Sequence, residues 1–196
     1  MHANERVGLD VLQIWDVNWY LDEAQCPCDV HFTGWIEQEA VRDRTIFHFG
    51  TGGHHHVGLK NFANGAPNTI LGITASPAEH EAFVKLAIEH ATLSRDYMAW
   101  FGDIYLLNAR LLPRIDIATM FHLCEFRGDR QDSYGGLTDA QVVDTLLGVM
   151  PKGGHIVLYK NSFAFDGAEA ITAALVAKGR LTRGIPYKSL VFYTKA

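Results

Sequence analysis

Short apolar runs alternate with longer segments of helical periodicity through most of this chain, and this alternation limits what it can fold into. The runs with strand character are 45–49, 69–74, 97–104, 115–123 and 155–159, with further strand material between 181 and 194. Strands separated by helices predict right-handed βαβ units and a mostly parallel sheet. Because the runs are apolar throughout, helices are expected on both faces of the sheet. The sequence therefore predicts an α/β, doubly wound fold.

Residues at the ends of the helical segments predict where helices begin and end. The expected helices are 77–91, 137–150 and 167–178. Pro77 suits a first helical turn, and Ser76 and Asp166 are predicted N-caps because their side chains accept hydrogen bonds from free backbone N–H groups. Gly179 is expected to end the last helix.

The first 44 residues have a different character and are predicted to form a helical extension or lid beside a main domain at 45–196. They hold three of the four tryptophans, Trp15, Trp19 and Trp35, and show no regular alternation. A helix is expected from Thr33, as its N-cap, to about residue 43. Tryptophan content and position together favour a lid that closes over a ligand site.

Composition excludes several classes of protein. The chain of 196 residues is 48% hydrophobic, too apolar for a disordered chain, and its formal charge is −5. A mildly acidic chain without an apolar run of about 18 residues is expected to bind neither nucleic acid nor a membrane. Its N-terminus does not resemble a cleavable signal, and three cysteines do not make a disulfide framework. We therefore expect a cytoplasmic protein with reduced cysteines.

Glycines and titratable residues follow the predicted strands at one edge of the sheet. Ligands of open parallel sheets lie beyond the carboxyl ends of the strands, where the strand order reverses. Gly50 and Gly52 follow the first strand, Asp103 follows the third, and the fourth leads into His122 and Glu125. Glycine permits a close backbone approach to a ligand, although ordinary strand-to-helix turns favour it too. This layout predicts a ligand site.

Five segments follow one another in an order that is itself informative. The first three are Ile46-Phe-His-Phe-Gly-Thr-Gly-Gly53, Ile70-Leu-Gly-Ile-Thr-Ala-Ser-Pro77 and Gly102-Asp103. The last two are Asp116-Ile-Ala-Thr-Met-Phe-His-Leu-Cys-Glu125 and Leu147-Gly-Val-Met-Pro-Lys-Gly-Gly-His-Ile-Val-Leu158. In this order, over about residues 45 to 195, they resemble the class I S-adenosylmethionine-dependent methyltransferases, a family with a Rossmann-like fold. No single segment is specific, but the series is.

The resemblance implies a site for S-adenosylmethionine. Gly50 and Gly52 would form the turn beneath the methionine part of the cofactor. Thr74 lies where the family usually has an acid that binds the ribose hydroxyls. Asp103 matches the acid that contacts the adenine amino group, and Ile104 is expected to pack against the base. A carboxylate suits that amine because it accepts N–H hydrogen bonds.

The sequence departs from the family pattern at three positions. His48 stands where an acid usually lies two residues before the first glycine, and His54 stands where a third glycine is common. Thr74 offers a hydroxyl in place of the ribose-binding carboxylate. Charged hydrogen bonds contribute about 1.5–3 kcal/mol, against about 1 kcal/mol for neutral ones. The absence of these acids is therefore expected to weaken cofactor binding about 10- to 100-fold unless other contacts compensate.

His122 and Glu125 are the predicted catalytic residues. They follow the fourth strand, where the family's substrate-facing residues lie, and histidine has a pKa suited to accepting a proton. Strand alternation would place them on opposite faces, so both face one cleft only if the strand ends near Leu123. In the alternative interpretation, His122 packs against a helix and Glu125 is a cap or is solvated.

Two groups of residues contain metal-ligand types, but their spacing is poor. Three interpretations are open for the consecutive histidines His54, His55 and His56: a metal site, contacts to a ligand, or polar loop residues. Adjacent side chains seldom converge on one ion. The second group is Cys26, Cys28, Asp29 and His31. One residue between the cysteines is poor zinc spacing, and no second pair is visible. We therefore predict no metal site.

The sequence favours methyl transfer from S-adenosylmethionine to a small-molecule acceptor, a displacement that depends mainly on positioning. The alternative is a binding protein that kept the fold and lost the reaction, as the missing acids at His48 and Thr74 indicate. A dinucleotide or nucleotide-sugar enzyme is disfavoured, because the third glycine and the ribose acid are absent. A strand near the C-terminus that lies at a sheet edge could pair with a second copy of the chain, so a homodimer is a further expectation.

Overall fold

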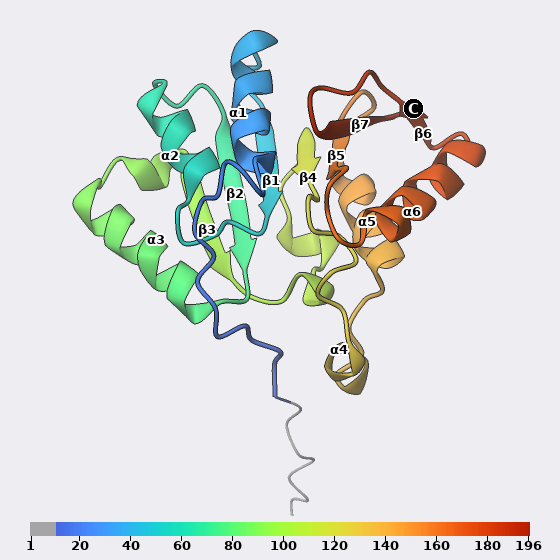
Figure 1. Cartoon of the computed structure of the whole chain (residues 1–196), viewed down its shortest axis with the longest axis horizontal. Helices are drawn as coiled ribbons and strands as arrows, with labels where there is room; N and C mark the ends of the chain where they lie inside the picture. Colours follow the sequence, from blue (N-terminus) through green and yellow to red (C-terminus); the bar gives the residue numbers. More distant parts are fainter. Residues whose placement is uncertain (1–10) are drawn as a thin grey trace, which may run out of the picture.

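The computed structural model describes residues 11–196, which form a seven-stranded sheet covered by helices (Figure 1). The strands are β1 (Thr45–Phe49), β2 (Thr69–Thr74), β3 (Tyr97–Phe101), β4 (Ile117–Thr119), β5 (His155–Tyr159), β6 (Leu181–Arg183) and β7 (Leu190–Lys195). The α-helices are α1 (Cys28–Gln38), α2 (His56–Ala63), α3 (Pro77–Glu89), α4 (Asp129–Ser133), α5 (Asp139–Val149) and α6 (Phe165–Ala177). Short 3-10 helices are η1 (Leu93–Arg95), η2 (Ile104–Leu106) and η3 (Ala109–Leu111). Within residues 11–196, no helix has both the length and the apolar character needed to cross a membrane.

The strand order is β3-β2-β1-β4-β5-β7-β6. The first five strands of the chain pair in parallel, whereas β7 runs antiparallel to both β5 and β6. The order reverses between β1 and β4, so the carboxyl ends of these two strands frame the edge where a ligand is expected. The predicted doubly wound, mostly parallel fold is confirmed.

Each face of the sheet has its own hydrophobic core, which explains the unbroken apolar runs. On one face, Ile46 of β1 lies in a buried cluster with Phe32 of α1 and Val57 of α2. On the other face, Phe47 lies in a cluster with Leu146 of α5. Because successive strand side chains point to opposite faces, a strand covered on both sides is apolar at every position.

Two strands end earlier than predicted. β3 stops at Phe101 instead of extending to 104, and β4 has only three residues instead of spanning 115–123. After Thr119 the chain leaves the sheet in turns. There the N–H groups of Leu123 and Glu125 donate to carbonyls three residues earlier, at 3.3 and 3.2 Å. These local bonds replace strand pairing and shape the ligand edge.

The helix caps were predicted with mixed success. Ser76 caps α3 as predicted, because its Oγ accepts the Glu79 N–H at 3.3 Å. The Thr33 cap is wrong, because Thr33 lies inside α1 and its hydroxyl donates to the Asp29 carbonyl at 3.1 Å. The Asp166 cap is also wrong, because α6 begins at Phe165, one residue before Asp166, and Asp166 lies in its first turn. A negative charge at that position is stabilised by the positive end of the helix dipole.

The predicted N-terminal extension is only partly helical. Its residues 1–10 lie outside the described residues, and residues 11–27 contain neither helix nor strand. The helical part is α1, which packs Phe32 and Ile36 into the main core. At the far ends of the sheet, β3 and β6 are the edge strands, and β6 is the C-terminal edge expected from the sequence. Dimer formation through it stays a prediction.

Gly58 and Gly148 are both helical glycines with opposite surroundings. A Cβ added at Gly58 in α2 would lie 2.6 Å from Tyr97 Cγ, and Tyr97 is held in the core by a 2.6 Å hydrogen bond between its hydroxyl and His55 Nδ1. A Cβ at Gly148 in α5 would meet nothing within 4 Å. Through overpacking, Gly58→Ala is expected to lower the free energy of unfolding by about 1–3 kcal/mol. Gly148→Ala is expected to raise it by about 0.5–1 kcal/mol, because alanine favours helix. Urea denaturation measures both, and shifts of the same sign would contradict this packing.

Candidate functional site

A cavity of about 250 Å³ lies at the carboxyl ends of the parallel strands. Its walls come from the turn after β1, the end of β2, the loop after β3 and the turn after β4. All the predicted cofactor-binding and catalytic residues line this one cavity: Gly50, Gly52, Thr74, Asp103, Ile104, His122 and Glu125. The rule for open parallel sheets thus predicted where these residues meet, while their roles stay predictions.

Gly50 and Gly52 carry the backbone along the cavity wall. Their φ angles are +80° and +56°, which side chains disfavour. A Cβ added at Gly52 would lie 2.6 Å from His54 Cδ2, whereas one at Gly50 would lie 3.8 Å from His122 Cδ2. The turn therefore needs glycine for backbone shape at both positions, and also for space at Gly52.

Glu79 places a carboxylate beside Thr74, where β2 itself lacks an acid. Thr74 Oγ1 donates to Glu79 Oε2 at 2.6 Å, and the backbone N–H of Trp19 donates to Oε1 at 3.4 Å. Glu79 is only 2% exposed, yet it lines the cavity. Burial raises the pKa of this carboxyl, although the Thr74 hydrogen bond opposes the shift. The acid missing from position 74 is thus replaced in space by one from the first turn of α3.

Asp29 places a second carboxylate near His48, the other position that lacks an acid. It is the second residue of α1, is 4% exposed and lines the cavity. Its Oδ1 lies 3.7 Å from His48 Nε2, and its Oδ2 lies 3.8 Å from His54 Nδ1. Burial alone would raise the pKa of Asp29, but His48, together with His54 and His56, outweighs burial and lowers it. Helices α1 and α3 therefore supply the acids that β1 and β2 lack.

Asp103 lines the cavity with a carboxylate that already has partners. Oδ1 accepts the Tyr105 N–H at 3.0 Å, which caps η2. Oδ2 accepts from the Tyr134 hydroxyl and from Gln131 Nε2, the latter at 3.5 Å. The next residue, Ile104, is buried against the same cavity. An amine entering here would share Oδ2 with these two donors.

His122 and Glu125 lie side by side, because β4 ends before them and strand alternation does not apply. His122 Nδ1 is 3.1 Å from Glu125 Oε2. The other oxygen, Oε1, accepts from the Ser162 hydroxyl at 2.5 Å and from the Phe163 N–H at 3.2 Å. Glu125 is therefore held at both oxygens and orients the imidazole ring.

Cys26 contacts the other side of the same imidazole. Its Sγ lies 3.8 Å from His122 Nε2 and 3.5 Å from Cys28 Sγ. A hydrogen bond from Cys28 lowers the pKa of Cys26 to about 5, with burial opposing and His122 assisting. Burial disfavours a charged His122, but hydrogen bonds to Cys26 and Glu125 outweigh it and raise the pKa of His122 to about 10. These two shifts favour the thiolate form of Cys26 and the imidazolium form of His122.

The three consecutive histidines point to different partners. His55 Nε2 donates to the Glu79 carbonyl at 2.8 Å, which leaves Nδ1 to accept from the Tyr97 hydroxyl. His56 Nε2 lies 3.3 Å from a threonine hydroxyl of α1, and only His54 lines the cavity. Burial lowers the pKa of all three. They do not form one site.

Residues 11–27 run past the carboxyl ends of the strands as an irregular segment, drawn in blue at the lower centre of Figure 1. The Gly53 N–H donates to the Trp19 carbonyl at 2.9 Å, and the Ser76 hydroxyl donates to a carbonyl of the segment at 2.6 Å. The rings of Trp15 and Trp19 meet Phe126 edge-on, with centroids 5.1 and 5.8 Å away. The segment thus forms one wall of the cavity.

No protein-family model and no curated protein matches the chain, but solved structures do. A candidate caffeoyl-CoA O-methyltransferase from Staphylococcus aureus has a TM-score of 0.63 at 7% identity. The match covers 91% of this chain and 86% of the Staphylococcus aureus chain. A SAM-dependent methyltransferase from Aquifex aeolicus has a TM-score of 0.60 at 11% identity, covering 89% and 95%. Magnesium protoporphyrin IX methyltransferase from Synechocystis PCC 6803, with bound SAH, has a TM-score of 0.59 at 8% identity, covering 93% and 90%. The chain has the class I methyltransferase fold.

The methyltransferase fold bears out the resemblance drawn from the motifs, at the level of architecture. The same fold also matches the cyclase SpnF, with a TM-score of 0.55 at 19% identity over 88% of this chain and 64% of that one. One architecture thus occurs in proteins named for different reactions, and the reaction must be argued from the site.

The sequence did not assign three residues to this cavity: Glu79, and Asp29 and Cys26, which were considered only as metal-ligand types with poor spacing. Glu79 stands three residues after Ser76, a spacing typical of a capping box, which predicts that its carboxylate faces the Ser76 N–H. In the structure that N–H donates to Thr74 Oγ1 at 3.0 Å, and the Glu79 carboxylate faces the cavity. Asp29 and Cys26 could not be assigned to the cavity locally, because His48 and His122, which they approach, are distant in sequence.

Proposed function

We propose that this protein transfers a methyl group from S-adenosylmethionine to a small-molecule acceptor. The observation that carries the proposal is the meeting, in one cavity, of the Gly50–Gly52 turn, the Thr74–Glu79 pair and Asp103. These are the positions that the family resemblance assigns to the methionine, ribose and adenine parts of the cofactor. In a class I methyltransferase fold, their convergence favours this cofactor over others.

The charge of the cavity supports a cationic ligand. Among the described residues that line it there are five acids and neither lysine nor arginine; the acids are Asp22, Asp29, Glu79, Asp103 and Glu125. A sulfonium and an ammonium group are favoured by such a field, whereas a pyrophosphate is repelled. This distribution disfavours the dinucleotide alternative.

The chain's own residues would hold the cofactor and orient the acceptor. Glu79 would accept from the ribose hydroxyls, and Asp103 from the adenine amine. When bound, S-adenosylmethionine supplies an electrophilic methyl carbon; as the acceptor's lone pair bonds to it, the C–S electron pair returns to sulfur. Because the imidazolium form of His122 is favoured, the proposed role of His122 and Glu125 is to orient an acceptor through hydrogen bonds. Removal of a proton by His122 would require that charge to be lost first.

The N-terminal segment is proposed to act as a lid. The cavity of about 250 Å³ is smaller than the roughly 300–1,000 Å³ typical of small-molecule sites. Entry of a cofactor therefore requires residues 11–27 to move outward and close again. Trp15 and Trp19 lie in the wall that would move.

Titration calorimetry with S-adenosylmethionine and its demethylated product tests the proposal. We expect micromolar binding, and about 10-fold weaker binding by Asp103→Asn, because a neutral amide replaces a charged acceptor. Asp144→Asn, at a half-exposed residue of α5 paired with Arg180, is the control. In the same titration, the fluorescence of Trp15 and Trp19 should change as the segment moves.

Absence of binding at millimolar cofactor would reject the enzyme and favour the alternative of a binding protein without the reaction. One observation favours that alternative: the Asp103 carboxylate is already satisfied by Tyr105, Tyr134 and Gln131. If Asp103→Asn binds as tightly as the unaltered protein, adenine does not use this carboxylate.

A further inference from the structure

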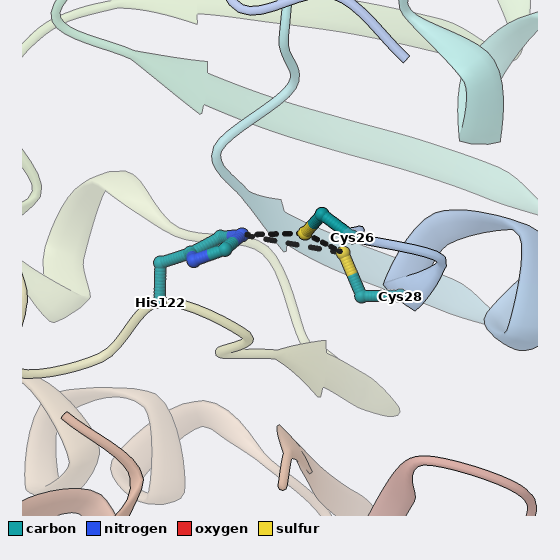
Figure 2. A group of neighbouring side chains, drawn as sticks. All are labelled: Cys26, Cys28 and His122. Atoms are coloured by element: carbon teal, nitrogen blue, oxygen red, sulfur yellow. Dashed lines mark hydrogen bonds between the residues drawn. The ribbon is translucent and has the colours of Figure 1, made fainter. Parts of the chain in front are cut away.

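Two thiols and one imidazole nitrogen meet at the wall of the cavity (Figure 2). Cys26 and Cys28 flank Pro27 at the start of α1, and His122 comes from the turn after β4. The Sγ–Sγ distance is 3.5 Å, and His122 Nε2 lies 3.8 Å from Cys26 Sγ and 4.0 Å from Cys28 Sγ. No part of the cofactor site described above uses the two thiols.

We propose that Cys26 Sγ, Cys28 Sγ and His122 Nε2 bind a Zn²⁺ ion whose fourth coordination position opens into the cavity. Two thiolates and an imidazole are a ligand set that favours zinc over magnesium or calcium. Three protein ligands with one open position are typical of catalytic zinc sites, whereas structural sites use four.

The distances between the three atoms match the edges of a zinc tetrahedron. With Zn–S of about 2.3 Å and Zn–N of about 2.0–2.1 Å, tetrahedral angles require edges of about 3.8 Å between sulfurs and about 3.6 Å between sulfur and nitrogen. The observed 3.5, 3.8 and 4.0 Å differ from these edges by a few tenths of an ångström. An ion at the centre therefore needs only small shifts of the side chains.

The surroundings of His122 are those of a metal ligand. Metal-bound histidines usually donate their other ring N–H to a carboxylate, which fixes the ring and the tautomer. Here Glu125 Oε2 lies 3.1 Å from Nδ1, and Ser162 and Phe163 in turn hold Glu125. Nε2 is thus directed at the two sulfurs with its orientation already set.

The short spacing of the two cysteines weighed against a metal site in the sequence, but the tertiary structure supplies the third ligand from a distant segment. The nearby His31, which completed the sequence cluster, bonds instead to the Ser189 hydroxyl at 2.6 Å. The third ligand is His122, which lies 94 residues beyond Cys28. A search for a second pair close in sequence therefore could not find it.

One consequence rests on the proposed function. A hydroxyl or thiol of the acceptor that binds at the open position loses its proton to solvent more readily, because zinc lowers the pKa of its ligands. The resulting anion keeps a lone pair with which to attack the methyl carbon. With zinc bound, His122 Nε2 is a ligand, so the metal and not the imidazole prepares the acceptor.

Metal analysis of the reduced, untagged full-length protein tests the site without reference to catalysis. After addition of zinc and dialysis against metal-free buffer, we expect about one Zn²⁺ per chain, and tetrahedral thiolate–cobalt absorption when Co²⁺ replaces it. Cys26→Ser should weaken zinc affinity at least about 100-fold, and Glu125→Gln about 10- to 100-fold. Cys124→Ser, at the one cysteine outside the cluster, should bind as the unaltered protein does.

Two results would overturn the site: zinc content below about 0.1 per chain, or equal zinc affinity in Cys26→Ser and Cys124→Ser. Thermal melting of the metal-free variants shows whether each one is folded. Cofactor titrations read the proposed function separately. Zinc binding without cofactor binding would reject only the function, and cofactor binding without zinc would reject only the site.

Discussion

Glu79→Gln is expected to weaken S-adenosylmethionine binding about 10- to 100-fold while leaving the protein at least as stable. The binding loss follows because a charged hydrogen bond to the ribose, worth about 1.5–3 kcal/mol, becomes a neutral one. The Thr74 hydroxyl donates to the Glu79 carboxylate at 2.6 Å. In the proposed cofactor site, Glu79 takes the place of the carboxylate that the second strand lacks.

The stability of the same variant should move in the opposite direction to its binding. The pKa of Glu79 is raised in the folded protein, mainly by burial, so the folded state holds this proton more tightly than the unfolded state. Stability from that group is full below the unfolded pKa and is lost as pH rises through the folded pKa. Above the folded pKa, the buried charge destabilises the folded state, and glutamine removes that cost.

Calorimetry and urea denaturation at pH 7 measure the two effects of Glu79→Gln. The control is Glu81→Gln on the same helix, where the side chain is 68% exposed and pairs with Lys85 at 3.0 Å. This change should alter neither quantity. Unchanged cofactor binding by Glu79→Gln would show that the ribose does not use this carboxylate, and a matching loss of stability would make its role structural.

Asp29→Asn is expected to lower the free energy of unfolding at pH 7 by about 1–3 kcal/mol. Asp29 is buried, but His48, together with His54 and His56, outweighs the cost of burial and lowers its pKa. A lowered pKa gives stability that is present above the unfolded pKa, near 3.9, and lost as pH falls through the folded value. The difference between variant and unaltered protein should therefore shrink below about pH 4.

Urea denaturation at pH 7 and at several values down to about pH 3 measures this loss. Asp144→Asn, with a side chain 51% exposed, should change stability by less than about 0.5 kcal/mol. Substitutions of two buried acids in one cavity are thus expected to affect stability differently: Asp29→Asn destabilises the protein, and Glu79→Gln does not. If Asp29→Asn and Glu79→Gln shift stability in the same direction at pH 7, the assigned charges are wrong.

Local patterns predicted most of the elements, because each depends on near neighbours in sequence. The strands 45–49, 69–74 and 155–159 have the predicted bounds, and Ser76 caps its helix as expected. Errors arose where long-range contact decided the outcome. The fourth strand was predicted too long, since its apolar run continues past Thr119 into a buried turn that lies outside the strand.

The candidate site was predicted in outline for a similar reason. In a parallel sheet, the residues that follow the strands meet at one edge whatever their chemistry, so Gly50, Thr74, Asp103 and His122 could be grouped from their order alone. Their partners could not. Glu79 faces the cavity instead of capping its helix, and Asp29 reaches His48 from a helix that precedes the sheet.

The order of apolar runs, helices and glycine turns determined by itself that this chain forms a doubly wound sheet with a ligand site at the ends of its strands. Periodicity and chain order carry that information, because secondary structure and strand connection depend on local spacing. Only the tertiary structure decided which side chains share the cavity, and above all that Cys26 and Cys28 meet His122. Such a meeting depends on how α1 docks against the turn after β4, and docking is set by contacts between segments that lie far apart in the sequence.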